Sequence, residues 1–265
     1  MSALLEWQQA VIMPVVARGN PDWTSDELEG LLLAGNRTCA VSCLERCCGS
    51  AIHICLSGGL DSSLSLAMVR KAFPSEPIRA YTIGGGPRHP DIQMAMLVAE
   101  SYDASHTLII PSERDITCAR EEHPCGKGVD EGGIGLYILY RHLAFLGAKC
   151  VLAHDGIDEL MGGYWAHRGC GGIGQMITEF EKFWQQLVPQ HLEPLHDVAR
   201  HFDIQVEHPY LTRDIVSYIS RIPLDDRTDR IESKKPLRAI GRRYNLPNEI
   251  LNRSKRGLCD ALKKE

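Results

Sequence analysis

Short apolar runs alternate with helix-like segments along the first part of the chain. The four runs are 51–56, 78–83, 106–110 and 150–153. A glycine or proline lies within three residues of the end of each run, a pattern that predicts buried strands. The segments between them with apolar residues at helical spacing are 62–73, 91–102 and 134–146. This alternation predicts an α/β fold with a parallel sheet and helices on both faces.

Helical patterns dominate the two ends of the chain. Residues 24–27 read Thr-Ser-Asp-Glu, a capping box that predicts a helix start. The pattern continues over 38–48, so Gly35 either ends this helix or is tolerated inside it. The helical segments beyond about residue 175, where strand signals fade, are 176–203, 212–221 and 234–244. The stretches 111–132 and 169–174 are expected to be loops.

Composition and charge narrow the class of protein. The 265 residues carry 29 Lys and Arg against 34 Asp and Glu, a net charge of −5. This balance argues against a broad nucleic-acid-binding surface but leaves room for a local anion pocket. No apolar run approaches the ~20 residues of a membrane helix, and the N-terminus lacks the basic start of a secretory signal. We therefore expect a cytoplasmic protein with no membrane partner.

The ten cysteines are expected to be free thiols rather than a disulfide framework. Cys39, Cys43 and Cys47 recur at every fourth residue and would form one stripe on a helix. Small, weakly polar side chains in such a stripe are typical of a core. No Cys-x-x-Cys pair occurs, so a structural zinc site is not expected.

A loop rich in glycine and serine follows the first predicted strand and opens a helix. Its sequence is Ser57-Gly58-Gly59-Leu60-Asp61-Ser62-Ser63. Two glycines allow the backbone to turn tightly beside an anion, and helix N-terminal N–H groups and hydroxyls can then face phosphates. Asp61 suits such a site when Mg²⁺ lies between its carboxylate and the phosphates. The alternative is a simple turn in which Asp61 caps the helix.

Four stretches of the chain resemble motifs of known enzymes. The loop 57–63 resembles the pyrophosphate loop of the N-type ATP pyrophosphatases, which cut ATP between its α and β phosphates. Residues 153–164 resemble the Ser-Gly-Glu-Gly-x-Asp-Glu-x-Phe-Gly-Gly-Tyr stretch of asparagine synthetases. Residues 208–211 resemble Val-Pro-Phe-Leu, and 234–255 resemble the Lys-x-x-Leu-Arg … Leu-Pro … Arg-x-Lys tail. Because the motifs keep the family's order, the chain is similar to the synthetase part of asparagine synthetases, in the PP-loop superfamily.

This resemblance implies a fold and a set of limits. The fold is a parallel five-stranded Rossmann-like sheet of the HUP, or adenine nucleotide alpha hydrolase-like, type, with a helical C-terminal part from about residue 175. The implied domain boundaries divide the chain into an N-terminal helical segment at 1–49, the ATP pyrophosphatase domain at 50–258 and a tail at 259–265. Residues 1–24 are expected to dock on a partner chain, and a homodimer is kept as an alternative.

The resemblance also implies roles for individual residues. Asp61 and Asp158 would share one Mg²⁺ that bridges the phosphates of ATP. Asp155 stands where the family has Glu and would act as an acid or base, and its alternative is a turn cap. Lys255 would neutralise the leaving pyrophosphate unless it belongs to a solvated basic tail, and Lys234 matches another family lysine. The residues that would contact ATP are Leu56, Ser57, Gly58, Gly59, Asp61, Ser62, Ser63, Ile83, His154 and Gly156, with Leu56 and Ile83 at the adenine.

The implied function is an amide-forming ligase that adenylates a carboxylate and passes the acyl group to ammonia or an amine. Only about fifty residues precede the phosphate loop, so we expect no glutaminase domain, and a separate glutaminase could supply ammonia. Thr212 and Glu207 stand where the family has Asp and Arg, which favours a carboxylate other than aspartate, although aspartate stays an alternative.

Three other functions stay open. The first is a cyclising ligase similar to β-lactam synthetase. The second is tRNA modification, against which the negative charge and the lack of Cys-x-x-Cys argue. The third is a nucleotide-binding regulatory subunit.

Overall fold

The computed structural model describes residues 4, 7, 8, 22–126, 128–168, 172–255, 257 and 262 of the chain. Five strands form one sheet in the order β3-β2-β1-β4-β5, and every neighbouring pair is parallel. The strands are β1 Ile52–Cys55, β2 Ile78–Ile83, β3 Ser105–Ile109, β4 Cys150–Leu152 and β5 Gln205–Glu207. Ile54 of the central β1 pairs with Ala80 of β2 and with Leu152 of β4, so the carboxyl ends of these strands meet at one edge.

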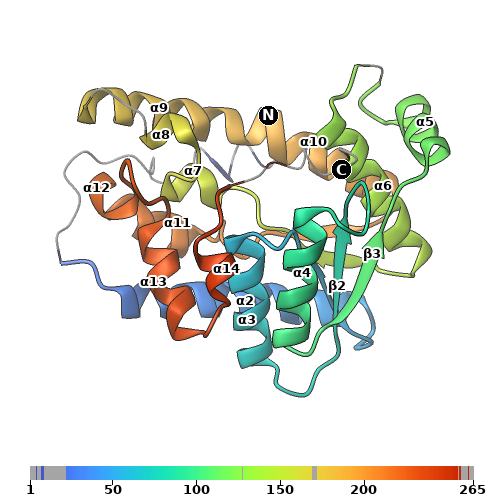
Figure 1. Cartoon of the computed structure of the whole chain (residues 1–265), viewed down its shortest axis with the longest axis horizontal. Helices are drawn as coiled ribbons and strands as arrows, with labels where there is room; N and C mark the ends of the chain where they lie inside the picture. Colours follow the sequence, from blue (N-terminus) through green and yellow to red (C-terminus); the bar gives the residue numbers. More distant parts are fainter. Residues whose placement is uncertain are drawn as a thin grey trace.

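Helices cover both faces of the sheet. α2 (Ser25–Arg46), α3 (Leu60–Ala72) and α4 (Pro90–Ser101) pack on one face, and α6 (Glu131–Phe145) and α10 (Glu193–His201) on the other. The other helices are α5 Glu113–Glu122, α7 Ile157–Met161, α8 Trp165–Arg168, α9 Ile173–Gln186, α11 Arg213–Ser220, α12 Leu224–Arg227, α13 Lys235–Arg243 and α14 Asn248–Leu251. The helices α8, α9, α11, α12 and α13 gather on the side of the molecule away from α5 (Figure 1).

Alternating side chains of the strands divide the core into two layers. Ile52 and Ile54 of β1 pack with α2, α3 and α4, whereas Tyr81 of β2 and Val151 of β4 pack with α6 and α10. A sheet that is buried on both faces needs apolar residues at successive positions. This explains why the sequence has short continuous apolar runs instead of an apolar–polar alternation.

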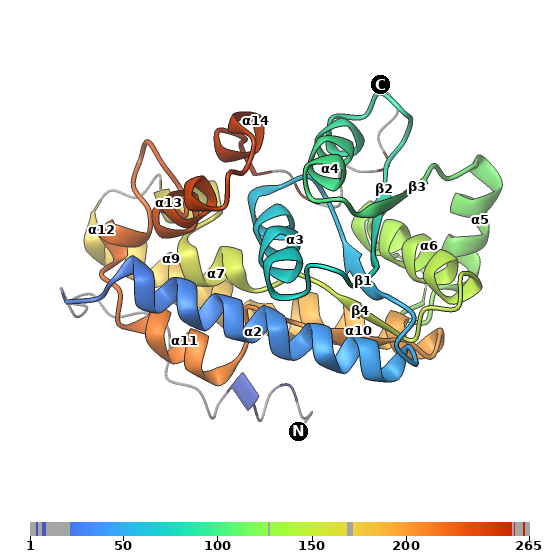
Figure 2. The same ribbon diagram turned by 90° about the horizontal axis from the view of Figure 1, so that it is seen from below.

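The N-terminal part of the described chain belongs to the same core as the sheet. The Thr24 side chain accepts a hydrogen bond from the Glu27 N–H at 3.2 Å, which caps α2 as the sequence predicts. α2 continues through Gly35, where a Cβ would lie 2.5 Å from the carbonyl oxygen of Pro209. Gly35 therefore allows another part of the backbone to approach the helix. Figure 2 shows α2 running past α3 along one side of the molecule.

Four features differ from the sequence-based expectations. The expected loop 111–132 contains α5, so the prediction of a loop was wrong for that segment. Only Ala119 of α5 is buried, so the sequence of this helix has almost no apolar pattern. The pattern did not locate β5, which has three residues of which only Val206 is buried. The expected helix over 176–203 is α9 and α10 joined by a π-helical turn, Leu187–Leu192. Of the expected loop 169–174, residues 169–171 lie outside the described residues, and the prediction was wrong for Ile173 and Gly174, which begin α9.

The cysteine prediction is confirmed within the described part of the chain. The free cysteines there are Cys39, Cys43, Cys47, Cys48, Cys55, Cys118, Cys125 and Cys150. Those of the predicted stripe are buried in the core between α2 and the sheet. Among the described residues, no helix is both long enough and apolar enough to span a bilayer.

Candidate active site

A cavity opens at the carboxyl ends of β1, β2 and β4. Its wall joins the loop after β1, the ends of β2 and β4, part of α6 and the chain around 233–255. The predicted site residues on this wall are Leu56, Ser57, Gly59, Asp61, Ser62, Ile83, His154, Asp155, Lys234 and Lys255. The predicted residues that adjoin the wall without forming it are Gly58, Ser63, Gly156 and Asp158. The cavity therefore brings together predicted site residues that are up to 199 positions apart, from Leu56 to Lys255.

The loop between β1 and α3 has the geometry of an anion-binding turn. Gly58 has φ +66°, and a Cβ there would lie 2.5 Å from the Ala95 nitrogen, so only glycine fits. The Ser57 N–H donates to the Ser62 hydroxyl at 3.1 Å, which closes the turn. The Ser63 hydroxyl is buried without a hydrogen-bond partner among the described residues. Since α3 begins within this loop, its first N–H groups are free donors for phosphate oxygens.

Four charged side chains alternate in sign beside this loop. Lys234 Nζ lies 2.5 Å from Asp61 Oδ2 and 2.6 Å from Asp158 Oδ1, and Lys255 Nζ lies 2.7 Å from Asp158 Oδ2. Burial alone would raise the pKa of Asp158, but the two ammonium groups outweigh it and hold that pKa well below its usual range. Burial would lower the pKa of Lys255, but Asp158 and Asp61 raise it. Asp158 and Lys255 thus support one another in their ionised forms.

Unusual backbone conformations create the space for these side chains. Lys234 has φ 53° and ψ 41°, a left-handed conformation that a non-glycine residue seldom adopts. A Cβ at Gly163 would lie 1.7 Å from Asp158 Oδ1 and 2.6 Å from Lys234 Cε. Gly156 has φ +90°, and a Cβ there would lie 2.4 Å from the Leu211 side chain. Gly163 is therefore needed for the close approach of Lys234, and Gly156 for that of Leu211.

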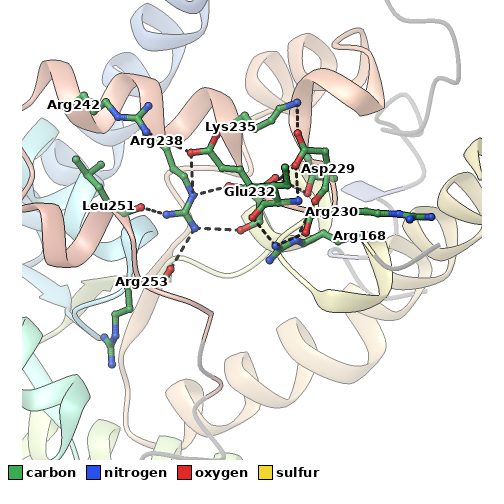
Figure 3. A network of polar contacts seen from close by, with 12 residues as sticks. Arg168, Asp229, Arg230, Glu232, Lys235, Arg238, Arg242, Leu251 and Arg253 are labelled. Atoms are coloured by element: carbon green, nitrogen blue, oxygen red, sulfur yellow. Dashed lines mark hydrogen bonds and ion pairs between the residues drawn. The ribbon is translucent and has the colours of Figure 1, made fainter. Parts of the chain in front are cut away.

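One guanidinium ties together the two segments that carry the site lysines. Arg238 donates to the carbonyl oxygen of Ser233 at 2.7 Å and also to the carbonyl oxygens of Leu251 and Arg253 (Figure 3). Ser233 directly precedes the first site lysine, and Arg253 lies two residues before the second. Arg238 is 8 % exposed, so this tie is shielded from water.

The turn that leads into α13 is also held from its other side. Asp229 Oδ1 accepts hydrogen bonds from the N–H groups of Ile231 and Glu232 at 2.8 and 2.7 Å. Arg168 donates to three successive carbonyl oxygens of this turn, at 229–231 (Figure 3). Lys234, the left-handed residue at the start of α13, therefore lies between this turn and the hydrogen bonds of Arg238.

Arg253 connects the C-terminal segment to the phosphate loop. Its Nη1 donates to the carbonyl oxygens of Gly58 at 2.9 Å and Ser57 at 3.4 Å, and its Nη2 pairs with Asp91. Sequence reasoning quoted Arg253 only as part of the tail motif and did not select it for the site. The feature of the sequence that could have identified Arg253 is its spacing, two residues before Lys255.

Asp61 and Asp158 have the chemistry of a magnesium site. Asp61 Oδ1 is buried and has no hydrogen-bond partner among the described residues, so it can accept a cation. In the same part of the chain, no group of three or more His, Cys, Asp or Glu forms a metal cage. Mg²⁺ commonly takes one or two carboxylates and completes its shell with substrate phosphates and water, so the residues fit it. Lys234 already lies between the two carboxylates, so ion and ammonium would share this space.

His154 and Asp155 follow β4 on the cavity wall. Burial lowers the pKa of His154 to about 3, so the ring is neutral, and its Nε2 is buried without a partner among the described residues. Burial raises the pKa of Asp155, against the opposing effect of Lys255 and His191. Asp155 is thus a stronger base than an exposed carboxylate. The sequence did not point to His191, which lies in the π-helical turn.

Glu159 is a titratable residue of the motif that sequence reasoning did not select. It is 2 % exposed, and the Tyr164 hydroxyl donates to its Oε1 at 2.9 Å. Burial and the neighbouring Asp158 charge raise the pKa of Glu159 to about 7. Glu159 does not form the cavity wall, and it can change charge near neutral pH directly behind the site.

Leu56 and Ile83 lie at the ends of β1 and β2, where the adenine was expected. The Leu56 N–H donates to the Tyr81 carbonyl oxygen at 2.8 Å, and the Leu56 carbonyl accepts from the Thr82 hydroxyl at 2.5 Å. Both polar backbone groups of Leu56 are therefore engaged in the sheet. Its role at the adenine stays a prediction that rests on its side chain and on its place in the cavity wall.

Comparisons with known proteins concern the fold and the family of the chain. The structure is similar to that of NMN synthetase from Francisella tularensis, with a TM-score of 0.50 and 13 % identity over 90 % of this chain and 78 % of that one, which supports the fold. NH3-dependent NAD synthetase from Campylobacter jejuni also matches, with a TM-score of 0.37 and 12 % identity over 66 % of this chain and 77 % of that one. No curated protein sequence matches significantly. The asparagine synthase family model matches residues 50–171 and 172–265, and the chain therefore belongs to the asparagine synthase family.

Proposed function

We propose that this chain is a carbon–nitrogen ligase that converts ATP to AMP and pyrophosphate. It adenylates a carboxylate, aspartate or a related acid, and transfers the acyl group to ammonia or an amine. Membership of the asparagine synthase family supports ATP use and amide formation. The observation that carries the proposal is the row of alternating charges, Asp61, Lys234, Asp158 and Lys255, beside a helix N-terminal loop.

In the first step a carboxylate oxygen of the acceptor attacks the α-phosphorus of ATP. The bond between that phosphorus and the α–β bridging oxygen breaks, and pyrophosphate leaves with the bonding electron pair. Lys255 and Lys234 hold positive charge where the leaving group becomes more negative, and the N–H groups at the start of α3 donate to its oxygens. Mg²⁺ held by Asp61 and Asp158, when bound, supplies further neutralisation of the phosphate charge.

In the second step a nitrogen nucleophile attacks the acyl carbon and AMP leaves. An ammonium ion must lose a proton before it can attack. The buried Asp155 carboxylate, with its raised pKa, accepts that proton. The neighbouring His154 is neutral and does not repel an ammonium ion.

The proposed nitrogen donors are free ammonia, an amine substrate, or ammonia delivered by a separate glutaminase. If the amine belongs to the acceptor itself, the same two steps close a ring, as in a ligase similar to β-lactam synthetase. Nothing in the row of charges depends on which donor is used, because that row handles ATP.

Product analysis tests this proposal. The protein is incubated with Mg²⁺, ATP, ammonium and a panel of carboxylates, and the nucleotide products are separated. AMP and pyrophosphate that depend on one acid, and that Asp61→Asn abolishes, would support the ligase. ADP and phosphate would contradict it. ATP binding without turnover on any acid would favour the nucleotide-binding regulatory subunit instead.

A further inference from the structure

The Lys234 ammonium lies directly between the two carboxylates that are suited to Mg²⁺. Its Nζ is 2.5 Å from Asp61 Oδ2 and 2.6 Å from Asp158 Oδ1. The most exposed of the three side chains is that of Asp61, at 12 %, so water screens these contacts poorly. Both carboxylates thus place an oxygen on the same ammonium. A metal ion that bridges the two carboxylates must therefore compete with Lys234.

The four charges of this row are balanced without a metal ion. Asp61 and Asp158 contribute two negative charges, and Lys234 and Lys255 contribute two positive charges, so their sum is zero. Mg²⁺ alone would add two positive charges to this buried space, which is strongly unfavourable. ATP carries more negative charge than one Mg²⁺ neutralises. The metal ion and the nucleotide together therefore bring no excess of positive charge.

The neighbouring charged groups of the described chain do not change this balance. Arg253 pairs with Asp91, and Arg238 Nε lies 4.0 Å from Glu232 Oε1, so each of these arginines has an acid of its own. Glu159 lies behind the row, and burial together with the charge of its neighbour raises its pKa to about 7. Near neutral pH it contributes less than one negative charge, which does not offset the two charges of Mg²⁺.

The Lys234 side chain has one open direction in which to leave the carboxylates. A Cβ at Gly163 would lie 2.6 Å from Lys234 Cε, so the lysine is enclosed on that side. The open side is the cavity, whose wall Lys234 shares with Ser57 and Ser62 of the phosphate loop. An ammonium that leaves the carboxylates therefore turns toward the place where the phosphates of ATP would bind.

We propose that Lys234 is a built-in counterion that makes metal binding at this site conditional on ATP. Mg²⁺ replaces the ammonium between Asp61 and Asp158 when phosphate oxygens arrive to receive that ammonium. This inference rests on the proposed use of ATP and Mg²⁺, and it adds an order of events to it. The exchange forms and breaks no covalent bond. It moves one positive charge from the carboxylates to the phosphates as the metal ion enters.

Binding of Mn²⁺ tests this exchange without any turnover. Mn²⁺ shares the preference of Mg²⁺ for oxygen ligands, and electron paramagnetic resonance separates its bound and free forms. Without nucleotide, Lys234→Met should bind Mn²⁺ at least about tenfold more tightly than the native protein, because one competing positive charge is gone. With the α,β-methylene analogue of ATP, which cannot be cleaved at that bridge, the native protein should also retain Mn²⁺.

Two controls show where the metal ion binds. Lys255→Met removes a lysine of the same row but leaves Lys234 between the two carboxylates, so it should change the Mn²⁺ affinity far less. The double variant Lys234→Met with Asp61→Asn lacks one proposed ligand and should lose the gained affinity. If Lys234→Met does not fold, Lys234→Gln takes its place, because the glutamine amide is neutral and can still donate to a carboxylate.

Urea unfolding gives a second measurement that does not depend on activity. A ligand that binds the folded state raises its stability. An excess of Mg²⁺ without nucleotide should therefore raise the unfolding midpoint of Lys234→Met and leave that of the native protein unchanged. Equal shifts for the two proteins would overturn the exchange.

The Mn²⁺ results and the fate of the ligase proposal can be told apart. Equal Mn²⁺ affinities of the native protein and Lys234→Met without nucleotide would overturn the exchange. A gained affinity that survives Asp61→Asn would also overturn it, because the metal ion then lies elsewhere. If the Mn²⁺ results are as expected but no acid gives AMP and pyrophosphate, the ligase proposal fails and the exchange stands.

Discussion

Replacing Lys234 by methionine is expected to destabilise the whole protein. Methionine is flexible and of similar length, so the packing should change little. Lys255 still pairs with Asp158, so the loss falls mainly on Asp61. Asp61 is 8 % exposed, its Oδ2 pairs with Lys234, and its Oδ1 has no hydrogen-bond partner among the described residues. A buried carboxylate that loses its counterion costs about 3–5 kcal/mol of unfolding free energy.

A matched control is available on the surface of the molecule. Lys149 Nζ lies 2.7 Å from Asp203, nearly the distance found at Lys234, but the two side chains are 55 % and 88 % exposed. Lys149→Met should therefore lower the free energy of unfolding far less than Lys234→Met does. The comparison keeps the chemical change constant and varies only the burial of the pair.

The pH dependence should also differ between the two variants. In the native protein the pKa of Asp158 is lowered, so its stabilising effect is present above the unfolded pKa of about 3.9 and is lost as the pH falls below it. Lys234 is the charged group that lowers this pKa most, so its removal takes away part of that stabilising effect. The stability gap between Lys234→Met and the native protein should therefore narrow as the pH falls below about 4.

Urea unfolding followed by tryptophan fluorescence and circular dichroism measures these differences. The reasoning predicts a large, pH-dependent loss for Lys234→Met and a small loss for Lys149→Met. Equal losses for the two variants, or a gap that does not change with pH, would refute the claim that Lys234 compensates a buried carboxylate.

Three further variants test other parts of the site. Gly163→Ala places a methyl group 1.7 Å from Asp158 Oδ1 and should abolish pyrophosphate release, whereas Gly174→Ala, with open space at its Cβ, should leave it unchanged. Asp155→Asn should lower kcat at least tenfold. The native enzyme should lose rate as the pH drops through the raised pKa of Asp155, and the variant should not show this loss. An unchanged pH profile would contradict the role of Asp155 as a base. Arg253→Met should raise the KM for ATP more than it lowers kcat because the phosphate loop loses its clamp, and an unchanged KM would mean that the clamp is structural only.

Much of the fold could be predicted because its signals are local. The strand 78–83 has the predicted limits, and β1, β3 and β4 lie within one residue of theirs. Each of these strands combines an apolar run with a turn residue close to its end. β5 lacks both signals, since Gln205 and Glu207 flank its single buried side chain. α5 was missed although Ser112 and Asp115 form a capping box at its start. This local signal does not enter a prediction that is based on the spacing of apolar residues.

The candidate site could be located from the sequence only where a motif marked it. The phosphate loop and the acidic turn at 153–164 could be identified because their glycines and carboxylates are close together in the sequence. Lys234 matched the family pattern only weakly as a single lysine. Its place between Asp61 and Asp158 depends on a left-handed backbone and on contacts across 173 residues of chain. No local pattern encodes such a position.

The most direct measurement follows oxygen atoms from the acceptor to the nucleotide. The acid that releases most pyrophosphate is labelled with ¹⁸O in its carboxylate and incubated with Mg²⁺, ATP and ammonium, and the AMP is analysed by mass spectrometry. Adenylation forms a bond between a carboxylate oxygen and the α-phosphorus, so breakage of the acyl bond must leave one ¹⁸O on AMP. One labelled oxygen per AMP is the predicted result. Unlabelled AMP, or label in inorganic phosphate together with ADP, would contradict the account.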